Sequence, residues 1–181
     1  IQHEIMSLTE RPGFLRLKGK DFIFSKYKLA LIARRQQDFV YSASCAMEFA
    51  PKENNQMAGL IVMYHNQLFY YLYMSYDEKL GYYLSIMKNI HDQFNLYAVA
   101  PVALDEPKVY LKAKVNYDVL QFYYATEPEV WKPLGGPLDM MVLSDEYSGG
   151  FTGAFVGLTC QDPVENRLFA DFDYFEYKEG V

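Results

Sequence analysis

The sequence contains few cysteines, no long apolar run and no excess of positive charge. Its 181 residues include two cysteines, Cys45 and Cys160, so a disulfide framework is not supported. Both lie in apolar, strand-like stretches, and we expect free, buried thiols. This usage favours a reducing compartment, and no signal peptide is visible, so the expected location is cytoplasmic. Because the chain begins at Ile1, we interpret it as a piece excised from a longer protein.

The charge balance excludes several classes of partner. The formal net charge is -6 and the pI is near 5.1, whereas a nucleic-acid-binding protein needs a basic surface to neutralise phosphate. Polar or charged side chains interrupt every apolar stretch before it reaches the roughly 20 residues of a membrane-spanning helix. We therefore expect neither nucleic acid nor a membrane as a partner, and a soluble protein that suits neutral ligands.

Motifs for cofactors and for common catalytic chemistries are also missing. Gly149-Gly150 is not followed by the Lys-Ser/Thr pair of a phosphate-binding loop, and no serine-nucleophile motif of the G-x-S-x-G form occurs. The three histidines, His3, His65 and His91, are scattered without a spacing suited to zinc. We expect no cofactor and no catalytic metal.

Aromatic residues in alternating patterns are abundant. The chain has 17 Tyr and 13 Phe, residue types that favour strands. From Phe39 to Phe49 the odd positions are apolar and most even positions polar, which predicts a half-buried strand. Residues 109–115 alternate in the same way, and after the break at Asn116–Asp118 the pattern resumes at Leu120, which predicts a β-hairpin.

Other stretches, residues 57–64, 68–76 and 154–160, are apolar on both faces, as strands covered on two sides are. We expect turns between the strands, including one at Pro133–Pro137, and about a dozen strands in all. A helical pattern fits only one turn, at Ser144–Tyr147. The sequence therefore predicts an all-β fold, an antiparallel sandwich of two sheets that forms a single domain over residues 1–181.

Acidic residues near the end of the chain are the first candidates for chemistry. Strand alternation places Asp171 and Asp173 on one face and Glu176 on the other, unless a bulge intervenes. Two carboxylates on one face could serve as the acid and base of a glycosidase. The alternative is a strand whose acids face solvent or hold a structural cation such as calcium, with Asp171 and Asp173 as its ligands. We favour the structural alternative.

Two sets of aromatic residues could contact a ligand. A carbohydrate platform could form from several tyrosines, although most of these must be packing residues; the candidates are Tyr70, Tyr71, Tyr73, Tyr82 and Tyr83. We expect Trp131 to anchor a loop. Glycines surround Phe151, and they permit a loop that presents this ring outwards. A tight turn with Phe151 folded back on the core is the other interpretation.

The stretch LSDEYSGGFTGAFVGLTCQD (Leu143–Asp162), followed by ADFDYFEY (Ala170–Tyr177), closely resembles the carboxy-terminal domain of glycoside hydrolase family 43 β-xylosidases. Earlier segments resemble it as well, in order along the chain: residues 8–19, 33–37, 56–64 and 70–78. The resemblance implies a concanavalin A-like β-sandwich, of jelly-roll type, that follows a catalytic five-bladed propeller absent from this chain. In the family the propeller carries the catalytic carboxylates, which hydrolyse xylosides with inversion.

The resemblance also implies the roles of particular residues. The loop Ser144–Phe155 matches the one that helps to wall the substrate pocket, with Phe151 reaching over the substrate and Gly150 and Thr152 beside it. Arg34, Arg35 and Gln36 match the family pattern and are expected in a polar network or an interdomain contact. The implied partners are the catalytic propeller of the same polypeptide and, through its active site, a xylo-oligosaccharide; the whole protein is expected to form a homo-oligomer.

Three functions follow from these observations, in order of preference. The first is a non-catalytic accessory domain that completes the pocket of a β-xylosidase. The second is an independent carbohydrate-binding module for xylan or xylo-oligosaccharides. The third is an autonomous hydrolase that uses Asp171, Asp173 or Glu176. We expect no activity from this chain alone.

Overall fold

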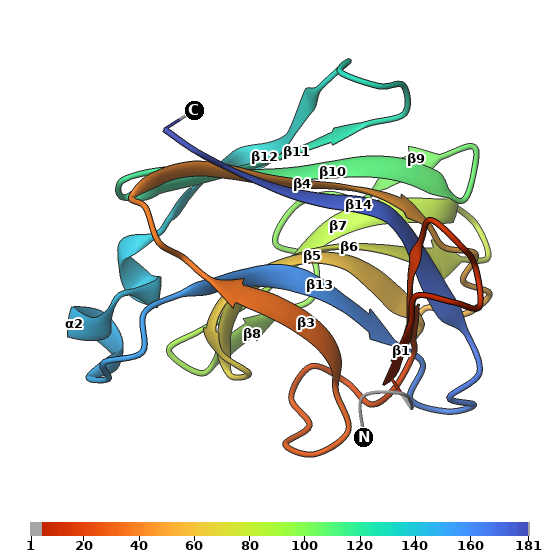
Figure 1. The fold of residues 1–181 in the computed structure, drawn as a ribbon, viewed down its shortest axis with the longest axis horizontal. Coiled ribbons are helices and arrows are strands. Elements are labelled where there is room, and N and C mark those ends of the chain that lie inside the picture. Colours follow the sequence, from red (N-terminus) through yellow and green to blue (C-terminus); the bar gives the residue numbers. More distant parts are fainter. Residues whose placement is uncertain (1–4, 181) are drawn as a thin grey trace.

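A computed structural model describes residues 5–180 of the chain. Its elements are almost entirely strands, joined by short turns (Figure 1). In chain order they are β1 (Met6–Ser7), β2 (Leu15–Lys18), β3 (Ala30–Arg35), β4 (Val40–Glu48), β5 (Met57–His65), β6 (Leu68–Asp77), β7 (Gly81–Ile90), β8 (Gln93–Asn95), β9 (Val102–Leu104), β10 (Lys108–Asn116), β11 (Val119–Ala125), β12 (Lys132–Asp139), η1 (Met141–Leu143), α2 (Asp145–Ser148), β13 (Phe155–Gln161) and β14 (Phe169–Glu179).

The strands form two antiparallel sheets that stack face to face (Figure 1). The first sheet has the order β1-β2-β14-β4-β10-β11-β12, and the second has the order β3-β13-β5-β6-β7-β8, with β9 also paired to β7. Side chains from the two inner faces interdigitate to form the core. This arrangement confirms the predicted all-β sandwich of concanavalin A-like type.

The alternating patterns lie where the sequence places them. Tyr41, Ala43 and Cys45 on β4 are fully buried between the sheets. The β10–β11 hairpin pairs Asn116 with Val119 across a two-residue turn, as predicted. Phe39 is the exception to the odd-numbered apolar pattern, because it precedes the strand and its side chain is 73% exposed. Cys45 and Cys160 are buried free thiols, as expected.

The second sheet is buried on both faces, which explains the continuous apolar runs of β5, β6 and β13. Its outer face carries a second apolar cluster that includes Ile61, Phe69 and Tyr71. Two connections cover this cluster: residues 19–29 contribute the buried Ile23, and the hydroxyl of Tyr73 donates a 3.0 Å hydrogen bond to the carbonyl of Leu96 in the other connection.

The turn predicted at Pro133–Pro137 is wrong, because these residues belong to β12. This strand lies at the edge of the first sheet, where a proline that donates no ladder hydrogen bond is tolerated. Gly135 adopts a φ of 67°, and the register with β11 shifts beside it. The glycine and the two prolines therefore mark a bulged edge strand.

Helical structure is minor. The predicted turn at Ser144–Tyr147 is confirmed as α2, which projects from one end of the sandwich beside η1 (Figure 1). None of the helices among residues 5–180 has the length and apolar character needed to cross a bilayer.

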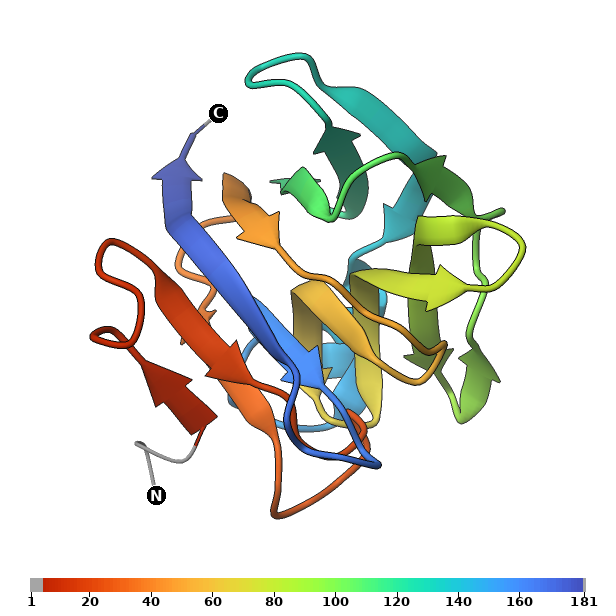
Figure 2. The ribbon, with the colours of Figure 1, turned by 90° about the vertical axis from the view of Figure 1, so that its right-hand side faces the viewer.

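Figure 2, turned by 90°, shows the β11–β12 connection standing above the layer that contains β4 and β14.

Candidate functional site

The loop after η1 begins with the single helical turn α2, whose two ends are set by Ser144 and Gly149. Ser144 caps the first turn of α2, because its side-chain oxygen accepts a hydrogen bond of 3.3 Å from the backbone N–H of Tyr147. Gly149 ends the turn in the left-handed conformation, with a φ of 70°, which glycine adopts at no steric cost. The turn therefore starts and stops within a few residues and leaves residues 150–153 at the surface.

Two side chains tie this loop to the sandwich. The hydroxyl of Tyr64, on β5, donates a hydrogen bond of 2.7 Å to Oδ1 of Asp145, and it also accepts a 3.3 Å bond from the backbone N–H of Thr152. The N–H of Gly153 donates to the same Oδ1 at 2.9 Å. The Gly153 N–H and the Tyr64 hydroxyl hold the pKa of Asp145 below its ordinary value.

Gly150 and Phe151 form the tip of the loop. A Cβ at Gly150 would lie 2.0 Å from the Tyr64 hydroxyl, so only glycine fits against it. The next side chain, Phe151, is 91% exposed. The interpretation in which Phe151 folds back on the core is therefore wrong. The loop instead presents a bare aromatic ring on a hydrogen-bonded base, with Thr152 exposed beside it.

An apolar surface lies next to this loop. A groove of about 310 Å³ runs between the loop and the β3–β4 and β10–β11 connections. Its rim carries three exposed side chains, Phe39, Tyr117 and Met141, and the rings of Phe39 and Tyr117 stack with centroids 6.5 Å apart. We call these three residues and Phe151 the end patch. Sequence reasoning missed its first three members, although two of them flank turns, where large apolar side chains are poorly covered.

Arg34, Arg35 and Gln36 lie on β3 and just after it, at the same end of the molecule. Arg34 places its guanidinium 3.9 Å from the ring centroid of Tyr177 and hydrogen-bonds to Gln37. The backbone of Gln36 donates to the carbonyl of Ala154 at 2.9 Å, and its side chain lines the groove. Arg35 is exposed. The Gln36 backbone therefore joins the loop to the edge of the sheet, while an interdomain role for the three residues stays a prediction.

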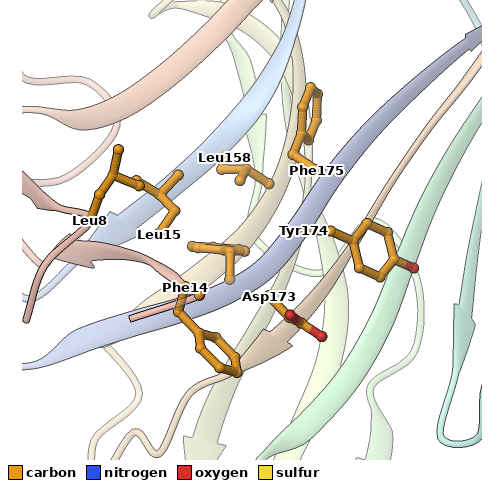
Figure 3. A pocket seen from close by; sticks show the side chains of 9 residues that line it. Leu8, Phe14, Leu15, Leu158, Asp173, Tyr174 and Phe175 are labelled. Carbon is orange, nitrogen blue, oxygen red and sulfur yellow. The ribbon is translucent and has the colours of Figure 1, made fainter. Parts of the chain in front are cut away.

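The alternation expected for the acidic strand is wrong, because β14 has a bulge between Phe172 and Tyr174. Asp171 faces outwards opposite Glu48, Asp173 is the extra residue of the bulge, and Glu176 lies on the same outer face as Asp171. Asp173 lines an open apolar notch of about 240 Å³, where it is the only acidic group among the described lining residues (Figure 3). The predicted pair on one face does not form.

Asp171 is occupied by arginines. Arg16 binds both of its carboxylate oxygens, at 2.8 and 2.9 Å, and Arg11 binds one oxygen at 3.0 Å and bridges to Glu48 at 2.8 Å. Burial raises the pKa of Asp171, but the bonds from Arg16 and Arg11 outweigh it, so the net pKa is lowered. Arg11 also separates two acids that face each other across the sheet, which would otherwise repel.

This environment disfavours two of the roles considered for Asp171. A general acid needs a raised pKa, and the pKa here is lowered. A calcium ligand needs free oxygen lone pairs, and guanidinium groups bind both carboxylate oxygens. Within residues 5–180, no cluster of three or more His, Cys, Asp or Glu side chains has the arrangement of a metal site.

The tyrosines considered for a carbohydrate platform are packing residues, as expected for most of them. Tyr70, Tyr71, Tyr73 and Tyr83 are all at most 4% exposed, because they lie on the two buried faces of the second sheet. The hydroxyl of Tyr70 donates to the carbonyl of Asp139 at 3.0 Å, as a buried tyrosine requires. Tyr82 is half-buried against Tyr76. These residues are packing residues.

Comparison with known proteins places the chain in a family. Residues 1–178 match the model of the β-xylosidase C-terminal concanavalin A-like domain. The chain is 37% identical over 178 residues to a putative β-xylosidase of Escherichia coli, covering 95% of this chain and 33% of that protein. It is 36% identical over 184 residues to a β-xylosidase of Bacillus subtilis, covering 98% and 34%.

A solved structure has the same fold. The crystal structure of a xylan β-1,4-xylosidase from Bacillus halodurans superposes with a TM-score of 0.93 at 35% identity, over 99% of this chain and 35% of that one. The chain thus spans about a third of the length of the curated relatives that it matches. Because the family model extends over residues 1–178, the chain belongs to the family of β-xylosidase C-terminal concanavalin A-like domains.

Proposed function

We propose that this chain is the accessory domain of a family 43 β-xylosidase-type glycoside hydrolase, and that it serves the reaction without supplying a catalytic acid or base. In this proposal it packs on a catalytic propeller of the same polypeptide and lends the loop Ser144–Phe155 to the wall of the substrate pocket. The share of the relatives' length that it spans, about a third, supports this placement.

The observation that carries the proposal is the exposure of Phe151. This phenyl ring is 91% exposed, so covering it with another surface or a ligand would remove apolar area from water and favour the contact. Its base is held by Tyr64 and Asp145, so the ring is presented from a fixed position. An aromatic ring at a pocket wall excludes water and packs on the apolar face of a sugar.

The end patch supplies a surface for the partner. Phe39, Tyr117 and Met141 are each more than half exposed and surround the groove next to the loop. A clustered apolar surface of this kind, bordered by the exposed Gln37 and Glu146, is typical of a contact with another domain. The docked propeller would then lie directly against the loop that carries Phe151.

The acidic residues of β14 support the assignment of chemistry to another domain. The Asp171 carboxylate is bound by two arginines, and Asp173 stands alone in an apolar notch. Neither arrangement provides the pair of carboxylates that glycoside hydrolysis requires. In this proposal the substrate of the whole enzyme is a xyloside at the non-reducing end of a xylo-oligosaccharide.

The proposal is tested by Phe151→Ala in the full-length enzyme, with 4-nitrophenyl β-xyloside as substrate. We expect kcat/KM to fall by about tenfold or more, because the pocket loses part of its wall and admits water. Tyr27→Ala is the matched control, since Tyr27 is 92% exposed and lies outside the end patch. Equal kinetics for the two variants, with both folded, would overturn the pocket-wall role.

Domain packing has its own test. Phe39→Asp in the full-length enzyme puts a charge into the proposed contact, and we expect protease cleavage between the domains to become faster. Phe22→Asp, at a site that is 48% exposed and outside the end patch, is the control. The same cleavage rate for both variants would exclude the end patch as the docking surface.

A further inference from the structure

A second groove lies on the outer face of the first sheet. Its volume is about 690 Å³, within the range of ligand-binding clefts. It runs along the last part of β14, next to Tyr110 on β10 and below the β11–β12 connection. Its lining residues are Tyr110, Pro128, Glu129, Tyr174, Phe175, Glu176, Tyr177 and Lys178. None of them belongs to the loop Ser144–Phe155 or to the end patch.

Two small side chains of β4 lie between β10 and β14 on this face of the sheet. Ala46 pairs with Tyr110 on one side and with Tyr174 on the other. Ser44, the next outward residue of β4, likewise pairs with Glu176. Strands in a sheet are about 4.8 Å apart, so the backbones of the two tyrosines are about 10 Å apart. Two half-buried tyrosines thus stand on either side of Ala46, and both line the groove.

Pro128 and Glu129 of the β11–β12 connection line one side of the groove. Glu129 adopts a φ of 62° there, and its carboxylate accepts a hydrogen bond of 3.3 Å from the indole N–H of Trp131. The ammonium of Lys112, on β10, lies 3.8 Å from the ring centroid of Trp131. This cation–π contact holds the β11–β12 connection against the sheet, and Pro128 and Glu129 of the connection form one side of the groove.

The lining residues offer a ligand both aromatic surfaces for stacking and polar groups for hydrogen bonds. Aromatic rings supply flat apolar faces, while Glu129 and Glu176 supply acceptors and Lys178 supplies donors. Lys178 and Glu176 form an ion pair of 2.9 Å, and Lys112 lies nearby beside Trp131. Two negative and two positive groups therefore surround the groove. Tyr110 is half-buried and lines the groove.

These features favour one class of ligand. A charged ligand would find no net charge of opposite sign, and a peptide that adds a strand needs an open sheet edge, whereas the strands here are paired on both sides. A sugar ring presents an apolar face to stack on tyrosine and hydroxyls to bond with carboxylates. We propose that this groove binds a short, neutral oligosaccharide, with Tyr110 and Tyr174 as stacking residues and Glu129 as a hydrogen-bond acceptor.

The experiment uses the 181-residue chain, so that a catalytic pocket makes no contribution to binding. Xylohexaose is titrated into the ¹⁵N-labelled chain, and the amide shifts of each residue are followed. Cellohexaose tests a second neutral chain, and hexa-galacturonate tests a charged one. We expect shifts at residues 110, 129 and 174–178 with the neutral sugars and not with the charged one. No shifts at millimolar sugar, or shifts confined to residues 149–153, would overturn the proposal.

Substitutions of the lining residues test whether the groove itself binds the sugar. Tyr110→Ala is expected to weaken binding about tenfold through the loss of a stacking face. Glu129→Gln leaves the packing intact and is expected to weaken it about fivefold through the loss of a charged acceptor. Tyr27→Ala is the matched control and should bind as the parent chain does, because Tyr27 is 92% exposed and lies outside both the groove and the loop Ser144–Phe155. Equal affinity of Tyr110→Ala, Glu129→Gln and the parent chain, or shifts induced by a proline-rich peptide in place of sugar, would also overturn the assignment.

Discussion

The hydroxyl of Tyr64 and the carboxylate of Asp145, 81 positions apart in the sequence, form a hydrogen bond of 2.7 Å that fixes the loop carrying Phe151. Tyr64 is 7% exposed and belongs to the central strand β5, so its position is set by the core. Oδ1 of Asp145, at the start of α2, accepts this bond and also accepts a hydrogen bond from the N–H of Gly153, so the two ends of the loop are held together. The rigidity of the loop thus comes from the sandwich.

Tyr64→Phe removes this bond and keeps the ring. We expect a loss of about 1 kcal/mol in the free energy of unfolding, the usual worth of such a bond. The larger effect should be local: hydrogen exchange at the amides of Thr152 and Gly153 should become faster, because both groups depend on the Tyr64–Asp145 pair. Tyr117→Phe, at a tyrosine that is 67% exposed, is the control. Unchanged exchange at both amides would contradict the role of Tyr64.

Gly150→Ala tests the close approach of the loop to Tyr64. The added Cβ would lie 2.0 Å from the hydroxyl, so either the loop or the tyrosine has to move. We expect a loss of about 1–3 kcal/mol, typical of overpacking, measured by urea denaturation. Gly136→Ala is the matched control, because a Cβ added there would meet no atom within 4 Å. Equal stability of the two variants would show that the loop has another arrangement.

Asp171→Asn removes the charge that Arg11 and Arg16 share. We expect a loss of about 2 kcal/mol in the free energy of unfolding, below the full cost of breaking a buried pair because both arginines are partly exposed. Asp173→Asn, two residues away on the exposed bulge, should change stability by less than about 0.5 kcal/mol. A thermal denaturation series compares the two. Equal losses would refute the distinction between the buried and the bulged acid.

Calcium provides a further check on the same carboxylate. Because guanidinium groups bind both oxygens of Asp171, we expect the melting temperature of the chain to be the same with millimolar calcium and with a chelator. A rise of several degrees with calcium, lost in Asp171→Asn, would show that the ion displaces an arginine.

The fold could be predicted from the sequence wherever one face of a strand is buried. The alternation in residues 109–115 follows from the burial of every second side chain, and the structure reproduces it in β10. In β4 the odd-numbered residues 41–47 are buried as predicted, but Ser44 and Ala46 of the other face are buried as well. The two-sided runs of β5 and β6 were also recognisable, because connections cover the outer face of their sheet. These patterns depend on local position alone.

The predictions failed where one residue changes the register. The bulge after Phe172 moves Glu176 to the face of Asp171, and the edge strand β12 accommodates Pro133, Gly135 and Pro137. Periodicity cannot locate a bulge in a strand whose two faces are both mixed, as in β14. The glycines around Phe151 did signal an exposed loop, but its contact with Tyr64 joins distant segments and has no local sequence signature.

Acid should destabilise the protein below about pH 4. The pKa values of Asp145, Asp162 and Asp171 are all lowered in the folded state. At Asp162 burial raises the pKa, but the hydrogen bonds from the backbone N–H groups of Leu168 and Arg167 outweigh burial, so the net pKa is lowered. A carboxylate with a lowered folded pKa stabilises fully above its unfolded value, near 4, and loses that contribution as the pH falls through the folded value. The melting temperature should therefore be nearly constant from pH 7 to pH 5 and fall steeply towards pH 3. Asp171→Asn should start lower and fall less steeply, because one of the carboxylates with a lowered pKa is gone. Parallel curves for the parent chain and the variant would mean that Asp171 titrates alike in the folded and unfolded chains.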